Sequence, residues 1–238
     1  MLACAGQFGE EGAVDAAAFM RAHRAYFEDF TTRSTYHSNA IEGSTLSYAE
    51  TYAILFNDNS LAVTATAREL YEAINHKYAL NMALRRLDEP LSEQLVKDVA
   101  IQINRNINEI GGYRRVQVVI RNAEHVPPAP NQVNQLMMQL VHGYNESADD
   151  DPFLREARFH VRFERIHPFE DGNGRTGRIL LNRGLMQAGL APVVIPFERR
   201  AEYLALLASG DAEAFAALLR ELERAEQERM ATFAEAEA

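Results

Sequence analysis

The sequence has little of three things that would point to a compartment or a partner. It contains one cysteine, Cys4, in 238 residues, so no disulfide can form within the chain and we expect a reducing, cytoplasmic setting. No apolar run approaches the roughly 20 residues of a membrane-spanning helix, so no membrane is expected. Basic residues number 24 against 34 acidic ones, a net charge of −10. This balance argues against nucleic-acid binding, although net charge describes the whole surface and not a single cleft.

Hydrophobic spacing predicts a mainly helical chain. Apolar residues recur at helical intervals in residues 13–33, 60–87, 91–107, 131–145, 151–166, 175–190 and from 198 to the end. Proline and glycine stand at several of the expected ends. Because no internal repeat or low-complexity linker separates these segments, we expect one compact domain.

Residues 111–130 break the helical pattern. They carry β-branched residues between glycine and proline, and RRVQVVI followed by RNAEHV predicts a short β-hairpin. A lone hairpin is not stable in water, so this one must lie against the helices. It is either a covered structural element or an exposed strand that docks a peptide by strand addition.

The stretch HPFEDGNGRTGR, residues 167–178, gathers the polar chemistry of the chain. Gly172 and Gly174 permit a left-handed backbone and a close approach of a ligand, and with Asn173 they can form an anion-binding nest of amides. The turn opens into a helix, whose free N–H groups also attract an anion. It therefore predicts a phosphate cradle, but not a P-loop, because no Gly-Lys-Ser/Thr follows.

Charged residues surround this cradle. Arg175 and Arg178 lie three apart on one helix face, where cations oppose the helix dipole, and a polyphosphate between them would relieve the conflict. His167 is a candidate general base, although a histidine before proline is often structural. Asp171 is a hard oxygen ligand of the kind that Mg²⁺ prefers. Glu170 is either exposed or a second acid.

At every defined position HPFEDGNGRTGR resembles the Fic-domain signature, H-P-F-x-[D/E]-G-N-G-R-x-x-R. GGYRRVQVVI…HVPP is similar to the flap hairpin of that family, and LMQAGLAPVVIP to the segment after its motif helix. The resemblance covers about residues 81–219. It implies a helical Fic fold with one small β-hairpin flap, in which residues 61–238 are the Fic core with C-terminal helices and residues 1–60 are N-terminal helices.

The resemblance implies a protein adenylyltransferase, which moves AMP from ATP to a Ser, Thr or Tyr hydroxyl of a protein and releases pyrophosphate. By analogy His167 deprotonates the hydroxyl and Asp171 holds Mg²⁺ or Mn²⁺ against the α- and β-phosphates. The phosphate-binding residues would be Gly172, Asn173, Gly174, Arg175 and Arg178, with Arg178 reaching the γ-phosphate. The flap residues that align the target would be Val116, Gln117, Val118, Val119 and Ile120. Tyr203 either faces the adenine or belongs to the core.

A second motif, SNAIEG, lies at residues 38–43. By itself it predicts a helix that ends at Gly43, and it leaves Glu42 near the negative end of the helix dipole, where it would prefer a cation. With Ser38, Glu42 and Gly43 it resembles the Fic inhibitory motif, [S/T]-x-x-x-E-[G/N], which implies the subclass with an N-terminal inhibitory helix. Glu42 would then pair with Arg178 and hold ATP in a non-productive pose.

The sequence favours a self-inhibited protein adenylyltransferase over several alternatives. One is a de-AMPylating or bifunctional Fic enzyme, in which Glu42 activates water to remove AMP. Others are Fic chemistry with UMP, phosphocholine or phosphate, and a nucleotide-binding regulator without turnover. The sequence does not identify the target protein, for which the chain itself is one candidate, and it leaves a homodimer open.

Overall fold

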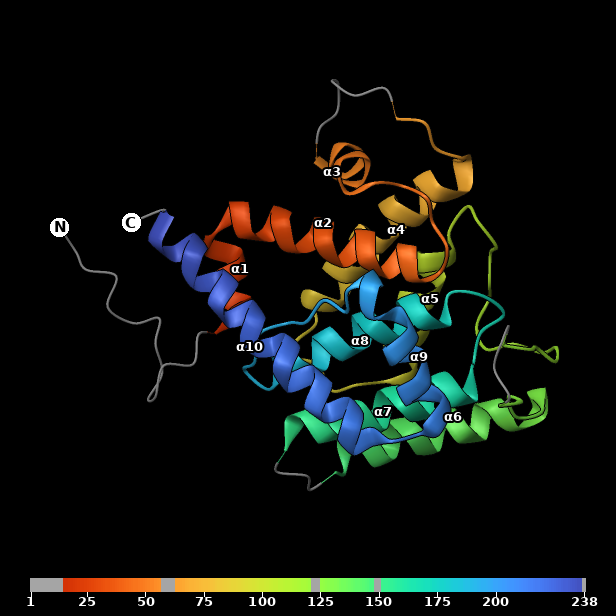
Figure 1. Cartoon of the computed structure of the whole chain (residues 1–238). Coiled ribbons are helices and arrows are strands. Elements are labelled where there is room, and N and C mark those ends of the chain that lie inside the picture. Colours follow the sequence, from red (N-terminus) through yellow and green to blue (C-terminus); the bar gives the residue numbers. More distant parts are fainter. Residues whose placement is uncertain (1–14, 57–62, 121–124, 148–150, 237–238) are drawn as a thin grey trace.

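The computed structural model describes residues 15–56, 63–120, 125–147 and 151–236 (Figure 1). The residues of these ranges form ten α-helices, one short 3-10 helix and no strand, which confirms the prediction of a mainly helical chain. The elements are α1 (Ala16–Ala22), α2 (Arg24–Ile41), α3 (Tyr48–Phe56), α4 (Ala67–Leu84), α5 (Glu93–Asn104), α6 (Pro130–Asn145), α7 (Pro152–Ile166), α8 (Asn173–Gln187), η1 (Phe197–Arg199), α9 (Arg200–Ser209) and α10 (Ala212–Ala236).

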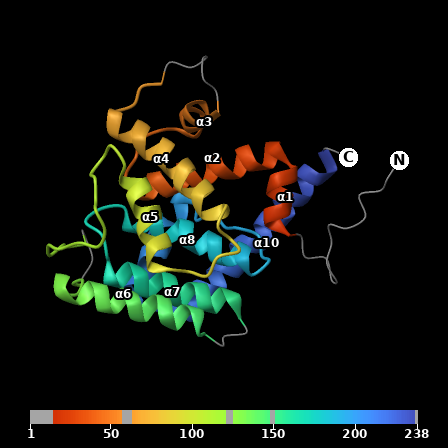
Figure 2. The ribbon, with the colours of Figure 1, turned by 180° about the vertical axis from the view of Figure 1, so that it is seen from behind.

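Helix α8 is the central helix, and apolar residues cover it from two sides. Ile179 and Leu180 belong to one apolar cluster, while Leu181 and Leu185 belong to a second cluster with α7, α9 and α10. Figure 1 shows α8 in the middle, with α2 on one side and α6 and α7 on the other, and Figure 2 shows the same order from behind. The first turn of α8 is also largely buried, through Asn173, Arg175 and Thr176, and Gly174 lines a pocket there.

Helix α2 approaches α8 with a polar face. Among its buried residues are Thr31, Thr32, Ser34, Thr35 and Ser38, an unusual set for a helix packed in the interior. Buried polar groups generally need hydrogen-bond partners, so this face is suited to meet charged groups on its neighbours. Helix α2 contacts both α4 and α8.

Helix α2 ends at the expected place. Ile41 is its last residue, Glu42 is the C-terminal cap, and Gly43 follows with φ +103°. The division that the sequence suggests between residues 60 and 61 lies outside the described residues and stays a prediction. Within the described ranges, no helix has both the length and the apolar content that a bilayer crossing requires.

The predicted β-hairpin is wrong for residues 111–120 and 125–128, which form no strand. Side chains hold the two arms together instead: Arg114 donates to the carbonyl of Pro128, and Gln117 Nε2 donates to the carbonyl of Pro127 at 3.0 Å. Pro127 and Pro128 have no N–H group, so these two positions cannot donate to a neighbouring strand. Four of the six residues of the expected second strand RNAEHV, residues 121–124, lie outside the described residues.

Candidate active site

The turn between α7 and α8 carries the signature residues, and its own hydrogen bonds fix it. Helix α7 ends at His167, which adopts the left-handed conformation with φ 51° and ψ 62°. Asn173 accepts from the Phe169 N–H and donates to the Phe169 carbonyl, both at 2.9 Å, and the Phe169 side chain is fully buried. Both polar atoms of the Asn173 side chain are engaged within the turn. A phosphate at this place would contact the backbone N–H of Asn173 and not its side-chain amide.

His167 lies in an environment that keeps its ring neutral. Burial lowers the pKa of His167, while the neighbouring backbone carbonyl of Glu164 acts in the opposite direction. The net pKa is lowered, so the imidazole is uncharged at neutral pH and can accept a proton. This is the protonation state that a general base requires.

Arg178 projects from α8 to α2 and is almost completely buried. Its Nε donates to Ser38 Oγ at 2.9 Å, and its Nη2 donates to the Ser38 carbonyl at 2.9 Å and to Glu42 Oε1 at 2.8 Å. The ion pair between Glu42 and Arg178 is therefore present. It joins two charges that each oppose the dipole of their own helix.

The carboxylate of Glu42 lies against the first turn of α8. A Cβ atom built on Gly174 would overlap Glu42 Oε1, which shows how closely the carboxylate approaches the helix backbone. The N-terminus of a helix is a natural anion site, so Glu42 lies where the sequence predicts a phosphate. A side chain at position 174 would exclude either occupant.

Arg175 and Asp171 form a second charged group beside the turn. Arg175 is buried, lies 3.2 Å from Asp171 Oδ1 and 3.1 Å from Glu72 Oε1, and keeps its Nε and Nη1 without an aligned acceptor. Buried donors without acceptors fit an anionic ligand. Burial raises the pKa of Asp171, but Arg175 and Arg68 outweigh it and the net pKa is lowered, so the carboxyl is ionised.

Asp171 fits a divalent cation that arrives with phosphates. In the described ranges no three His, Cys, Asp or Glu side chains gather into a metal site, and in the signature turn the candidate ligand is the carboxylate of Asp171. Mg²⁺ is generally bound in this way, through one or two carboxylates together with phosphate oxygens and water.

A small pocket brings together the predicted base and the predicted inhibitory glutamate, whereas Ser38 and Gly43 do not line it. It has a volume of about 150 Å³, and its lining includes Glu42, His167, Gly174, Arg178 and Ile120. Ile120 is thus the flap residue that reaches the site. Val116 and Val119 are 51% and 84% exposed, and they lie on the surface beside it.

The sequence leaves two placements open for Tyr203, beside the adenine or in the core, and the structure has it in the core. Its side chain is 1% exposed, and its hydroxyl lies 2.7 Å from His160 Nε2 and 3.5 Å from Arg178 Nη1. The ring packs with His160 and Phe215. Its edge still lines the small pocket, so Tyr203 supports the site from behind Arg178.

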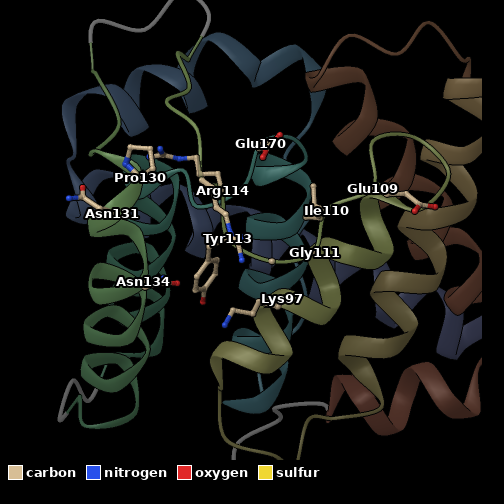
Figure 3. Close-up of a pocket in the computed structure, with 12 residues that line it drawn as sticks. Lys97, Glu109, Ile110, Gly111, Tyr113, Arg114, Pro130, Asn131, Asn134 and Glu170 are labelled. Atoms are coloured by element: carbon tan, nitrogen blue, oxygen red, sulfur yellow. The ribbon is translucent and has the colours of Figure 1, made fainter.

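A larger pocket of about 950 Å³ lies beside the turn (Figure 3). Its lining includes Tyr113, with the ammonium group of Lys97 4.4 Å from the ring centre, and Glu170. Neither His167 nor Arg178 reaches it. The candidate chemistry therefore belongs to the smaller pocket, although this groove is larger.

Sequence reasoning missed two residues that hold the site together. Arg114 is buried and donates through Nε to the His167 carbonyl at 2.8 Å, and through Nη1 to the Val116 carbonyl at 3.0 Å. It fixes the flap segment to the catalytic turn. Arg68 on α4 forms an ion pair with Asp171 at 2.7 Å. Both contacts join segments far apart in the chain, and no local sequence pattern predicts them.

The fold and this site together define a Fic domain. Residues 90–185 match the model of the Fic/DOC family, and they span the catalytic turn and most of α8. The chain is a Fic/DOC family protein, homologous to the protein adenylyltransferases named Fic.

Relatives and a solved structure agree with this assignment. The chain is 34% identical to protein adenylyltransferase Fic of Drosophila grimshawi over 214 residues, which are 84% of this chain and 42% of that protein. It is 37% identical to the protein of the same name from Nematostella vectensis over 191 residues, 75% of this chain and 42% of that one. The chain thus spans about two fifths of the length of these curated relatives.

The solved structure is a Fic-domain-containing signaling protein from Bacteroides thetaiotaomicron. It aligns with a TM-score of 0.80 and 25% identity, over 94% of this chain and 96% of that one. The helical arrangement therefore agrees along nearly the whole of both chains.

Proposed function

We propose that the chain is a self-inhibited protein adenylyltransferase, which transfers AMP from ATP to a Ser, Thr or Tyr hydroxyl of a protein. The observation that carries the proposal is the ion pair between Glu42 and Arg178, formed at the start of α8 in the pocket that also contains His167. It supports the proposal because the candidate base, the predicted anion site and the carboxylate that would compete for it line one small pocket. The names of the homologous relatives support the same activity.

The residues would divide the chemistry as follows. His167 takes the proton of the attacking hydroxyl, the oxygen forms a bond to the α-phosphorus, and the bond to the leaving pyrophosphate breaks. The backbone of Gly172 to Gly174 and the guanidinium groups of Arg175 and Arg178 bind the phosphate oxygens. Mg²⁺ or Mn²⁺ held by Asp171 would neutralise phosphate charge.

Inhibition follows from competition for Arg178. While Glu42 binds this arginine and covers Gly174, the terminal phosphate of ATP cannot take the same place. ATP then binds in a pose from which AMP is not transferred. Withdrawal of Glu42 would open the site without any change in the catalytic turn.

Labelled ATP tests the proposal. Glu42→Gly should raise the incorporation of AMP into protein, with the chain itself as the first acceptor to examine, and His167→Ala should abolish it. His142→Ala, which alters an exposed histidine on α6, is the matched control and should behave as wild type. Unchanged incorporation in Glu42→Gly would overturn the inhibitory role, and transfer by His167→Ala would overturn the assigned base.

A second candidate function is the removal of AMP from a modified protein. It is favoured by the position of Glu42, whose side chain is 41% exposed and lines the pocket with His167, where it could activate a water molecule. Glu42→Gly protein that has modified itself provides the substrate. Wild-type chain should release AMP from it and Glu42→Gln should not; no release by wild type would overturn this candidate.

A further inference from the structure

Four alternating charges form a closed ring at the edge of the catalytic turn. Arg68 Nε lies 2.9 Å from Glu72 Oε1, and Arg68 Nη2 lies 2.7 Å from Asp171 Oδ2. On the other side of the ring Arg175 pairs with both acids, at 3.1 Å from Glu72 and 3.2 Å from Asp171. Two of these residues come from the first turns of α4 and two from the signature.

The two arginines of this ring differ greatly in exposure. The Arg175 side chain is 2% exposed, whereas the Arg68 side chain is 55% exposed. Separating a buried ion pair is costly, but an exposed pair contributes little and is easily exchanged with water. Arg68 is therefore the member of the ring that can leave, and Arg175 is the member that stays.

The two oxygens of Asp171 have different partners. Oδ1 accepts the Gly172 N–H at 2.6 Å and faces Arg175, which fixes the carboxylate in the turn. Within the described part of the chain, the one hydrogen bond to Oδ2 comes from Arg68. Oδ2 is thus the oxygen that a new cation would bind, and Arg68 now donates a hydrogen bond to it.

We propose that Arg68 is the built-in counter-cation of Asp171 and that a divalent cation displaces it from Oδ2 when nucleotide binds. This inference rests on the proposed function, since it takes Asp171 as the carboxylate that holds the cation. Glu72 makes the exchange inexpensive because it keeps its contact with Arg68 Nε after Nη2 has left Asp171. Arg68 is accordingly a positioning residue that acts through Asp171.

The test is a Mn²⁺ titration of the whole chain with ADP, in which free Mn²⁺ is followed by electron paramagnetic resonance and the Mn²⁺ bound by ADP alone in a protein-free titration is subtracted. Arg68→Gln should bind Mn²⁺ about two- to fivefold more tightly than wild type, the range set by an exposed ion pair. Arg68→Lys retains the positive charge and should stay within about twofold of wild type. Tighter binding is a result that simple loss of structure does not give.

Arg86→Gln is the matched control. Arg86 follows the far end of α4, pairs with Glu89 and Asp98, and its replacement removes the same single charge. Arg68→Gln that binds Mn²⁺ no more tightly than Arg86→Gln, or more weakly than wild type, would overturn the inference.

Asp171→Asn separates the inference from the proposed function on which it rests. Loss of Mn²⁺ binding in this variant places the ion at Asp171. Unchanged binding would overturn the metal assignment and the inference with it, whereas a failure confined to Arg68→Gln overturns the inference alone. AMP transfer is not measured, so a chain that transfers no AMP still tests the role of Arg68.

Discussion

Replacing Glu42 with glutamine should raise the affinity of the chain for a nucleoside triphosphate but not for a diphosphate. Glutamine keeps the size of the side chain and removes its charge. Since Glu42 and the γ-phosphate compete for Arg178 in the proposed mechanism, only a nucleotide that carries a γ-phosphate gains from the change. In that mechanism a diphosphate would not reach the guanidinium of Arg178.

The structure sets the size of this effect. Arg178 is 7% exposed and lies 2.8 Å from Glu42 Oε1, and a hydrogen bond between charged groups is worth roughly 1.5–3 kcal/mol. The Glu42 side chain is 41% exposed, so solvent screening reduces the value to about 1–2 kcal/mol. The corresponding gain in affinity is about 5- to 30-fold.

Calorimetry with α,β-methylene ATP and α,β-methylene ADP measures both affinities without turnover, because the bond that AMP transfer would break is replaced by a methylene bridge. Glu28→Gln is the control: it lies on the same helix, pairs with Arg24 at 2.8 Å and loses the same charge. An equal gain for both nucleotides would indicate general electrostatics and refute the competition. No gain for either would refute it as well.

Three further predictions concern buried groups on α2, α7 and α8. Ser38→Ala should lower the free energy of unfolding by about 1.5–3 kcal/mol in denaturant titrations, because Arg178 Nε loses its acceptor, and a loss below about 0.5 kcal/mol would contradict this. Burial raises the pKa of Glu164 from 4.5 to about 8, so the stability that its protonated form contributes is lost as pH rises through that window. In Glu164→Gln the free energy of unfolding should therefore depend less on pH. An unchanged pH dependence would show that Glu164 does not titrate in this window. Gly184→Ala should lower the melting temperature despite the better helix propensity of alanine, because its methyl group would overlap the carboxyl of Glu156; a higher melting temperature would show that the site can relax.

The sequence predicted the signature turn in part, because some of its determinants are local. Gly172 adopts the left-handed conformation that glycine permits, with φ 76°. Gly174 is already part of α8, and the left-handed backbone of His167 has no local signal in the sequence. Glu42 was harder, since it lies far from the turn in the chain. Its unfavourable place at the end of α2 indicated a missing cation, and the family resemblance supplied Arg178 as that cation.

Contacts between distant segments could not be predicted from local sequence patterns. The ion pair of Arg68 with Asp171 links residues 103 positions apart, and nothing near Arg68 distinguishes it from any solvated arginine on a helix. The hairpin was predicted from β-branched residues alone, and such a pattern describes side chains suited to a strand without showing whether the partner strand can donate hydrogen bonds.

The attachment of the flap segment through Arg114 has a consequence for how the protein can change. The guanidinium binds carbonyl oxygens of Val116, Pro128, Ile166 and His167, and every residue type offers such an oxygen. Side chains along the segment can therefore be exchanged without weakening its anchor. If the proposed function holds, a surface of this kind would acquire a new acceptor protein by mutation while the geometry around His167 is inherited unchanged.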